Sequence, residues 1–233
     1  MHATLGNLRQ GLLAAIAVLL GGCASETLFE SNFDVTPPGQ PPAHVQQVGT
    51  ADVFGGAGQV VVVGAPGGAT GKWVQIGRPN PDTNIAGLVG RLTAIRGPGR
   101  YVFTGFFYMP TGTGLASINF ETPNPVQPGL ETFLHLDFTT DNKVRVDDNP
   151  NITFGSFTRN QPFIIEVALN TTVSPATAHI VLSGAGASGV FDYTTKPVFQ
   201  QASQQFGDVR VWMGFPWTGF FDATQLVVTH QTN

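Results

Sequence analysis

Residues 133–148 read FLHLDFTTDNKVRVDD, and this stretch decides the fold. Its first half places an apolar residue at every second position from Leu134 to Phe138, and its second half does the same with Val144 and Val146. Alternation with a period of two puts the apolar side chains on one face of a β-strand, so each half predicts a half-buried strand. The intervening TDN consists of residues that favour turns. The two strands are therefore expected to pair as a hairpin.

The same rhythm extends in both directions along the chain. We predict strands over residues 28–34, 59–63, 72–76, 88–95, 101–109, 115–120, 165–169, 179–182, 190–193 and 209–213, with a closing strand around Leu226 and Val228. Residues 198–206 are mostly polar, and a single helical turn or a loop is expected there. Glycine, proline, asparagine and aspartate separate the strands. Many short strands separated by such turn-forming residues predict an all-β sandwich or barrel.

The N-terminal residues have the pattern of an export signal. Arg9 precedes the uncharged run GLLAAIAVLL at 11–20, which suits a signal peptide and is too short to span a bilayer as a helix. The run ends in LGGC at 20–23, which resembles the lipobox of bacterial lipoproteins, with an aliphatic residue three positions before cysteine and small residues between. The resemblance implies a signal peptide over residues 1–22, cleavage before Cys23, and attachment of membrane lipid to its thiol and its new amine.

The lipobox resemblance also implies a location. A lipid-anchored protein of the cell envelope is expected, because two or more acyl chains hold a protein stably on a membrane. Ala24 follows the cysteine, whereas lipoproteins retained in the inner membrane tend to carry aspartate there, so the outer membrane is the expected location. Residues 23–233 are expected to form one domain, with the proline-rich residues 37–42 as a loop inside it.

The order of the segments suggests a family. LFESNFD at 28–34 is followed by GQVVVVGAPGG at 58–68, then by the hairpin, PFIIEVALN at 162–170 and FFDATQLVVT at 220–229. This order resembles the concanavalin A-like lectin and glucanase superfamily, whose jelly roll is shared by laminin-G-type domains. The resemblance implies a jelly-roll β-sandwich of two antiparallel sheets over most of the chain. It implies no single activity, because one sandwich hosts many.

The composition excludes several classes of protein. Charged residues make up 11% and the net charge is −4, which excludes a strongly basic nucleic-acid binder. A single cysteine excludes an intramolecular disulfide framework and a cysteine-based zinc cluster. GAGASG at 184–189 has the spacing of a dinucleotide-binding loop, but a predicted strand follows it instead of the required helix. It is therefore interpreted as a glycine-rich turn.

The densest acidic group consists of Asp137, Asp141, Asp147, Asp148 and Asn149. Calcium binds carboxylate and amide oxygens, and relatives of the jelly-roll fold often hold it in such loops, so a calcium site is one interpretation. The other is ordinary turn and loop chemistry, in which aspartate and asparagine are favoured. We favour the second, and no cofactor or resident metal is expected.

Strand parity suggests a ligand-binding surface. Trp212 and Arg210 alternate with apolar residues of their strand, and His135 and Asp137 alternate with the leucines of theirs, so all four are expected outside the core. Trp217, in the loop that follows, is expected to rim the same surface. Flat aromatic rings of this kind stack on sugars while neighbouring polar groups bond the hydroxyls. The alternative is that the rings cover a second apolar surface.

The expected function is that of a membrane-anchored, non-catalytic lipoprotein whose jelly roll binds carbohydrate or another envelope component. A second class is a polysaccharide hydrolase or lyase, for which Glu166, Asp137 and His135 are the first candidates. Against it, no strand carries the Glu-x-Asp-x-x-Glu arrangement of the superfamily's glycosidases, and no Arg, Gln, His and Tyr set of a jelly-roll lyase is visible. A third class is a structural scaffold of the envelope.

Overall fold

The computed structural model describes residues 25–123, 130–196 and 205–232, so the signal peptide, Cys23 and residues 198–204 lie outside the described residues. The strands are β1 (Ser25–Ser31), β2 (Thr50–Phe54), β3 (Val60–Gly64), β4 (Lys72–Arg78), β5 (Ala86–Arg91), β6 (Arg100–Tyr108), β7 (Ala116–Pro123), β8 (Leu130–Phe138), β9 (Val144–Val146), β10 (Asn149–Phe154), β11 (Pro162–Asn170), β12 (Thr177–Gly184), β13 (Ala187–Thr194), β14 (Asp208–Met213) and β15 (Gly219–Gln231). No helix in these ranges is long and apolar enough to cross a membrane.

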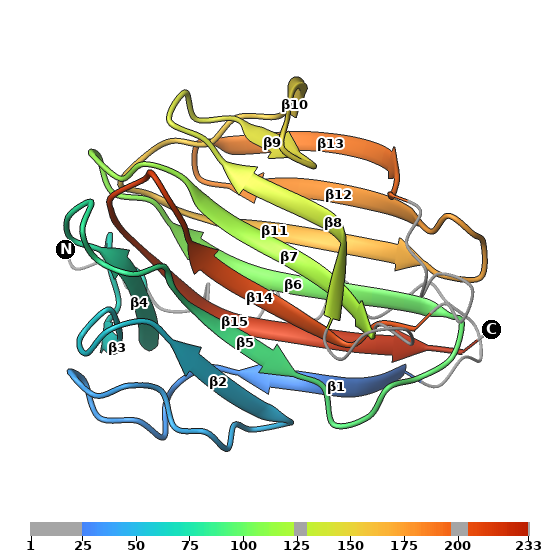
Figure 1. Ribbon diagram of the computed structural model, residues 1–233, viewed down its shortest axis with the longest axis horizontal. Coiled ribbons are helices and arrows are strands. Elements are labelled where there is room, and N and C mark those ends of the chain that lie inside the picture. The colour runs from blue at the N-terminus through green and yellow to red at the C-terminus, as the bar shows by residue number, and fades with distance from the viewer. Residues whose placement is uncertain (1–24, 124–129, 197–204, 233) are drawn as a thin grey trace, which may run out of the picture.

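The strands form two sheets that pack face to face, as Figure 1 shows. Sheet A has the order β13-β12-β11-β6-β15-β4-β3, with β1 also pairing with β15. Sheet B has the order β10-β9-β8-β7-β14-β5-β2. All the pairings are antiparallel. The predicted all-β fold of two antiparallel sheets is therefore confirmed.

The hairpin that decided the fold is present. β8 and β9 pair with Leu136 opposite Val146 and Phe138 opposite Val144, and Asn142 takes the positive φ of 63° that the turn requires. The glycine-rich turn between β12 and β13 is also present, with Gly186 at φ 69°. The strand predicted at 88–95 was too long, because β5 ends at Arg91.

The core lies between the sheets and consists largely of phenylalanine rings. Phe103 on β6 meets Phe120 on β7 edge to face at 5.4 Å between ring centroids, and Phe107 on β6 meets Phe138 on β8 at 5.1 Å. All four rings are fully buried. Aromatic pairs in these geometries add about 0.5–1.5 kcal/mol each to the burial of their area, so they fix how the sheets stack.

A β-bulge in β8 sets which of its side chains face outward. The register shifts between Phe120 and Glu121 of β7, so Leu134 faces Phe120 while Thr132 faces Glu121. Phe133 is the extra residue, and both it and Leu134 are buried in the core. Thr132 and His135 therefore share the outer face of sheet B, although their spacing of three is wrong for a regular strand.

Candidate functional site

The outer face of sheet B carries rows of side chains that the strand register aligns. The first row runs from Phe54 through Gly87, Trp212 and Ser117 to Asp137. The second row consists of Asp52, Val89, Arg210, Asn119 and His135, and the third of Thr50, Arg91, Asp208, Glu121 and Thr132. Directly opposite residues have Cβ atoms about 4.5–5.5 Å apart, so neighbours in each row touch. The register thus brings together residues that are far apart in the sequence.

Asp137 is the centre of a polar network on this face. Its carboxylate accepts hydrogen bonds from Ser117 Oγ at 2.6 Å and from Arg145 Nη2 and Nε at 2.5 and 3.0 Å. His135 Nε2 lies 2.9 Å from the same carboxylate. The Asp137 side chain is 1% exposed. Burial by itself raises the pKa of Asp137, but its bonds to His135, Ser117 and Arg145 outweigh burial and lower that pKa below its ordinary value.

His135 lies between two carboxylates. Besides the Asp137 contact, its Nδ1 is 3.0 Å from Asp148 Oδ2. Burial alone lowers the pKa of His135, but the two aspartates outweigh burial and raise that pKa above its ordinary value. The imidazole is thus stabilised in its charged form, in which both ring nitrogens carry protons. A histidine in this state is a poor general base, because a base needs an unprotonated nitrogen.

The acidic group around this histidine arises from turn chemistry. Asp147 and Asp148 form the two-residue turn between β9 and β10, with φ of 55° and 56°. Type I′ hairpin turns need positive φ at both central residues, which aspartate tolerates. The Asp147 carboxylate accepts hydrogen bonds from the backbone N–H of His135 and from the hydroxyl of Tyr193, both at 2.9 Å.

One donor set on this face has the composition of a metal site. One ligand atom each from His135, Asp137 and Asp148 lie within 4.8 Å of one another. Arg145, however, already places its cationic guanidinium on Asp137, and Asp141, also of the acidic group considered for calcium, accepts a hydrogen bond from Thr139 instead of joining the set. The residues therefore fit a resident divalent cation poorly, since it would compete with an arginine for the same carboxylate.

Trp212 is the aromatic centre of the face and is partly exposed. Its Nε1 donates a hydrogen bond to Asn119 Oδ1 at 3.0 Å, and its ring lies 6.2 Å from the His135 ring at an interplanar angle of 31°. On its other side is Gly87, where an added Cβ would lie 2.6 Å from Trp212 Cβ and 2.5 Å from the Phe54 ring. Only glycine leaves room there for the Trp212 Cβ and the Phe54 ring.

The third row contains two buried carboxyl groups that face each other. Asp208 on β14 lies opposite Glu121 on β7, and their side chains are 0% and 3% exposed. Arg91 Nη1 donates to Asp208 at 2.5 Å and Arg210 Nη2 to Glu121 at 3.0 Å. Burial, together with the neighbouring Glu121 carboxyl, raises the pKa of Asp208 to about 8. The pair is not visible in the sequence, because its two carboxyl groups come from different strands, β14 and β7.

The charges of the face neutralise one another. Arg91 bonds Asp52 and Asp208, Arg145 bonds Asp137, and Arg210 bonds Glu121. Each of these three arginines therefore already bonds at least one carboxyl group of the same chain, although the buried Nε of Arg210 has no hydrogen-bond partner among the described residues. The surface offers hydrogen-bonding groups and an aromatic ring without a large net charge.

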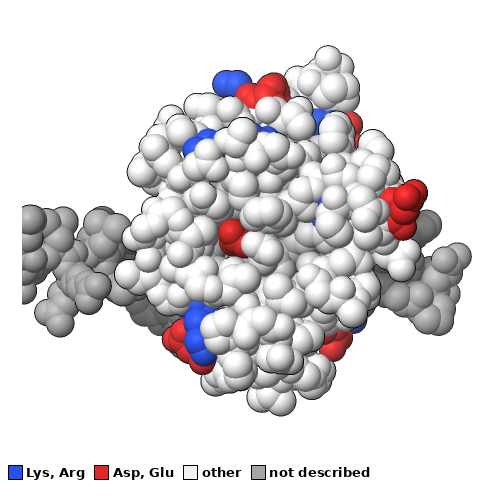
Figure 2. Space-filling view, turned by 90° about the vertical axis from the view of Figure 1, so that its left-hand side faces the viewer, with Lys and Arg blue, Asp and Glu red and all other residues white. Residues whose placement is uncertain are grey.

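Trp217 lies at one end of this face, in the loop between β14 and β15. It lines a depression of about 210 Å³ together with Arg145 and Asp141, and a second depression of about 530 Å³ lies beside it. The fully buried Arg78 fixes the loop by donating to the carbonyl oxygens of Gly214 and Trp217 at 3.1 and 2.5 Å. Figure 2, which views the end of the sandwich at the left of Figure 1, shows a mostly uncharged surface.

The structure places Trp212, Arg210, His135 and Asp137 on the outer face of sheet B. Glu166 does not join them. It alternates with core residues of β11, so it faces outward from sheet A, on the opposite side of the sandwich. An active site that combines Glu166 with Asp137 and His135 is therefore wrong. Sequence reasoning also missed Asn119 and Ser117 on β7, whose outward parity was the one available signal.

No protein-family model and no curated protein matches the sequence. Among solved structures, the alginate lyase Aly36B is similar with a TM-score of 0.57 at 12% identity, covering 90% of this chain and 98% of the lyase. Lectin II from Ulex europaeus is similar with a TM-score of 0.53 at 10% identity, covering 89% of this chain and 100% of the lectin. The catalytic domain of a glycoside hydrolase family 131 protein from Coprinopsis cinerea gives 0.54 at 10% identity, covering 87% and 93%.

These likenesses show the fold. The chain has a jelly-roll β-sandwich fold of the concanavalin A-like type, which it shares with a lectin, an alginate lyase and a glycoside hydrolase domain. Fold alone does not choose among binding, elimination and hydrolysis, so the choice rests on the residues of the face.

Proposed function

We propose that this protein is a non-catalytic lipoprotein whose jelly roll binds neutral carbohydrate on the outer face of sheet B, between Trp212 and Trp217. The observation that carries the proposal is the indole of Trp212, which is partly exposed, held by Asn119, and surrounded by polar groups. An amphipathic ring with adjacent hydrogen-bonding groups suits a sugar, whose faces are apolar and whose edges carry hydroxyls.

The paired charges of the face favour a neutral ligand. A polyanion needs cationic groups that are free to meet it, whereas Arg91, Arg145 and Arg210 already bond carboxylates of this chain. Binding a polyanion here would require breaking ion pairs whose carboxylates are buried, which is costly because each carboxylate would remain unpaired. Hydroxyl groups, in contrast, accept and donate hydrogen bonds without disturbing the pairs.

The same residues disfavour catalysis. A glycosidase places its two carboxyl groups about 5 Å or more apart with the substrate between them. Glu121 and Asp208 are instead buried against each other and held by arginines. The two aspartates raise the pKa of His135 and so favour its charged form, which makes it a weaker candidate for abstracting a proton. The proposal therefore expects binding without turnover.

The anchor at Cys23 belongs to the same proposal. β1 begins at Ser25, two residues after Cys23, and Ser25 pairs with Gln231 at the C-terminal end of β15. Trp217 precedes Gly219 at the other end of β15, a strand of 13 residues that spans about 40 Å at roughly 3.3 Å per residue. A lipid on Cys23 would tether the end of the sandwich remote from Trp217, leaving the ligand face directed away from the membrane.

A glycan array tests the binding, with the full-length chain purified in detergent. We expect neutral polysaccharides to bind better than acidic ones. Trp212→Ala and Trp217→Ala are expected to lose that binding, while Val190→Ala, at an exposed position on sheet A, retains it. Unchanged binding in both tryptophan variants would rule out the site. The anchor is tested separately by metabolic labelling with palmitate, which Cys23→Ser should abolish.

A second candidate function is polysaccharide lyase activity, which one observation favours. Asn119, His135 and Arg210 lie in a single row, and amide, imidazole and guanidinium groups are able to bind and activate an acidic sugar. Release of unsaturated products from acidic polysaccharides, lost in His135→Gln, would establish it. Absence of such products together with retained binding supports the non-catalytic proposal.

A further inference from the structure

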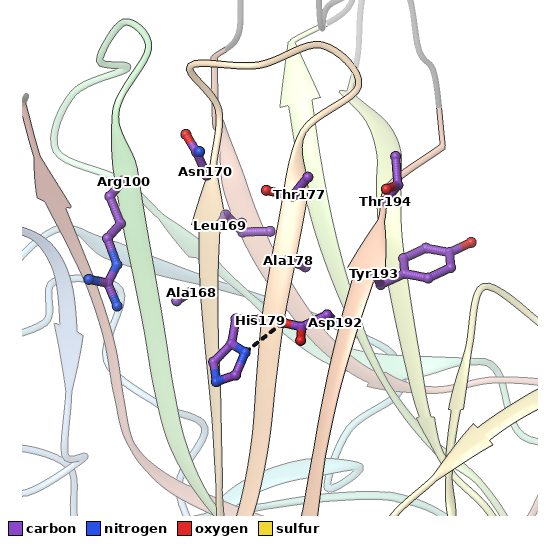
Figure 3. A pocket seen from close by; sticks show the side chains of 10 residues that line it. All are labelled: Arg100, Ala168, Leu169, Asn170, Thr177, Ala178, His179, Asp192, Tyr193 and Thr194. Atoms are coloured by element: carbon purple, nitrogen blue, oxygen red, sulfur yellow. Dashed lines mark hydrogen bonds and ion pairs between the residues drawn. The ribbon is translucent and has the colours of Figure 1, made fainter.

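A separate pocket opens on the other side of the sandwich, on the outer face of sheet A. It has a volume of about 450 Å³ and lies across β6, β11, β12 and β13 (Figure 3). Its polar lining comes from Arg100, Asn170, Thr177, His179, Asp192 and Thr194. None of these residues belongs to the face that carries Trp212.

The pocket forms because the side chain at its floor is small. The register aligns Arg100, Asn170, Thr177 and Thr194 in one row, and Ala168, His179 and Asp192 in the next. Ala168 lies between longer side chains and is 8% exposed even though it faces away from the core. Its methyl group leaves a hollow that a larger residue would fill. In Figure 3 the Arg100 side chain extends along β6 toward the level of Ala168 and His179.

Arg100 differs from the other arginines of the described residues. Arg78, Arg91, Arg96, Arg145, Arg159 and Arg210 each bond carboxylates or carbonyl oxygens of this chain. Among the arginines of the described ranges, Arg100 alone has a side chain that makes no hydrogen bond, ion pair or ring contact. A guanidinium matches a carboxylate with two parallel hydrogen bonds, so this side chain is available for an acidic group.

The remaining ionisable groups of the pocket satisfy each other. His179 Nδ1 lies 2.6 Å from Asp192 Oδ1, so the Asp192 carboxylate has a partner in the lining, whereas the guanidinium of Arg100 has none among the described residues. Glu166 on β11 belongs to the adjacent row of the sheet and does not line the pocket. Asn170, Thr177 and Thr194 supply an amide and two hydroxyls beside Arg100, and these groups suit the hydroxyls of a ligand.

We propose that this pocket is a second saccharide site, specific for a carboxylate-bearing sugar such as a uronic acid, with Arg100 binding the carboxylate. This site is independent of the one proposed on sheet B, because it is formed by other residues on the opposite sheet. It also prefers an acidic sugar, whereas the site on sheet B prefers a neutral one. The domain would then contact two chemically different glycans, one on each face.

Saturation-transfer NMR with D-glucuronic acid and D-glucose tests this proposal on the full-length chain in detergent. Glucuronic acid is expected to bind at least tenfold more tightly than glucose at this pocket, since a charge-assisted pair contributes that much. Arg100→Gln should remove the preference, Arg100→Lys should retain part of it, and Ala168→Leu should block binding at this pocket by filling the hollow.

Trp212→Ala provides the matched control, because it is expected to leave glucuronic acid binding unchanged while it abolishes neutral glycan binding on sheet B. Equal binding of the two sugars in Trp212→Ala, where the site on sheet B is removed, or an unchanged preference in Arg100→Gln, would overturn the proposal. Arg100 is exposed, so its variants are expected to fold, and an unchanged melting temperature verifies this. Failure here with binding retained on sheet B would leave the proposed function intact.

Discussion

Trp212 Nε1 donates a hydrogen bond to Asn119 Oδ1 at 3.0 Å, across the β14–β7 pair. Trp212 lies opposite Ser117 and Asn119 lies opposite Arg210, so the bond runs diagonally between two rows of the face. The indole is thereby fixed before any ligand arrives, which reduces the entropy lost on binding.

Asn119→Ala tests this preorganisation. Removing the acceptor frees the indole while the ring itself stays, so neutral glycan binding is expected to weaken by roughly tenfold without disappearing. Titration followed by tryptophan fluorescence measures the change. Asn151→Ala, at an exposed position in β10, is the control and should bind normally. An Asn119→Ala variant with full affinity would show that the hydrogen bond does not matter for binding.

Asp137→Ala is expected to be strongly destabilising. The substitution leaves Arg145 and His135 without their shared carboxylate, and breaking such a buried network costs roughly 3 kcal/mol in the free energy of unfolding. Urea unfolding measures it. The exposed pair of Arg96 and Glu26 serves for comparison, since Glu26→Gln should leave the unfolding midpoint almost unchanged. Equal effects of the two substitutions would argue that the network is not structural.

His135→Gln is expected to lower stability in a pH-dependent way. The pKa of His135 is raised by Asp137 and Asp148, so the folded state binds its proton more tightly than the unfolded state does. This contribution is fully present below the unfolded pKa of 6.5 and is lost as the pH rises through the folded pKa. The melting temperatures of wild type and variant should therefore converge with rising pH. A constant difference across that range would contradict the assignment.

Asp208→Asn is expected to show a pH dependence in the same direction over a different pH range, because the pKa of Asp208 is also raised in the folded state. Burial and Glu121 raise the pKa of Asp208 from 3.8 to about 8, so the folded state holds a proton that the unfolded state has released between these values. Wild type therefore loses stability as the pH rises through this range, and the neutral amide removes that loss. The melting temperature of the variant relative to wild type should be higher at about pH 9 than at about pH 5. A parallel pH dependence in the two proteins would refute this.

Phe107→Ala tests the stacking of the sheets. The ring is fully buried and contacts Phe138 from sheet B as well as Phe163 and Phe221 from sheet A. Truncating a buried phenylalanine costs about 3–5 kcal/mol through lost burial and the cavity it leaves. Val190→Ala at an exposed site is the control for calorimetry. A small effect would mean that the two sheets repack around the cavity.

From the sequence, only those site residues can be predicted whose outward orientation follows from the alternation within a single strand. Trp212 and Arg210 were placed outside the core because Val209 and Val211 alternate with them, and both valines are fully buried. The neighbours Asn119 and Glu121 were not reached, because they come from β7, and β7 is joined to β14 only by the sheet order. The bulge at Phe133 was also invisible, since two consecutive apolar residues do not show which one is extra.

The sequence by itself determined the strand rhythm, the β8–β9 hairpin and the side of each strand that faces the core, because these depend on residues close together in the chain. Only the tertiary structure decided which strands are neighbours. That ordering placed Asp208 against Glu121, matched each arginine of the Trp212 face with a carboxylate, and left Arg100 on the opposite sheet without one. Long-range pairing is set by the packing of the whole core, and no single segment encodes it.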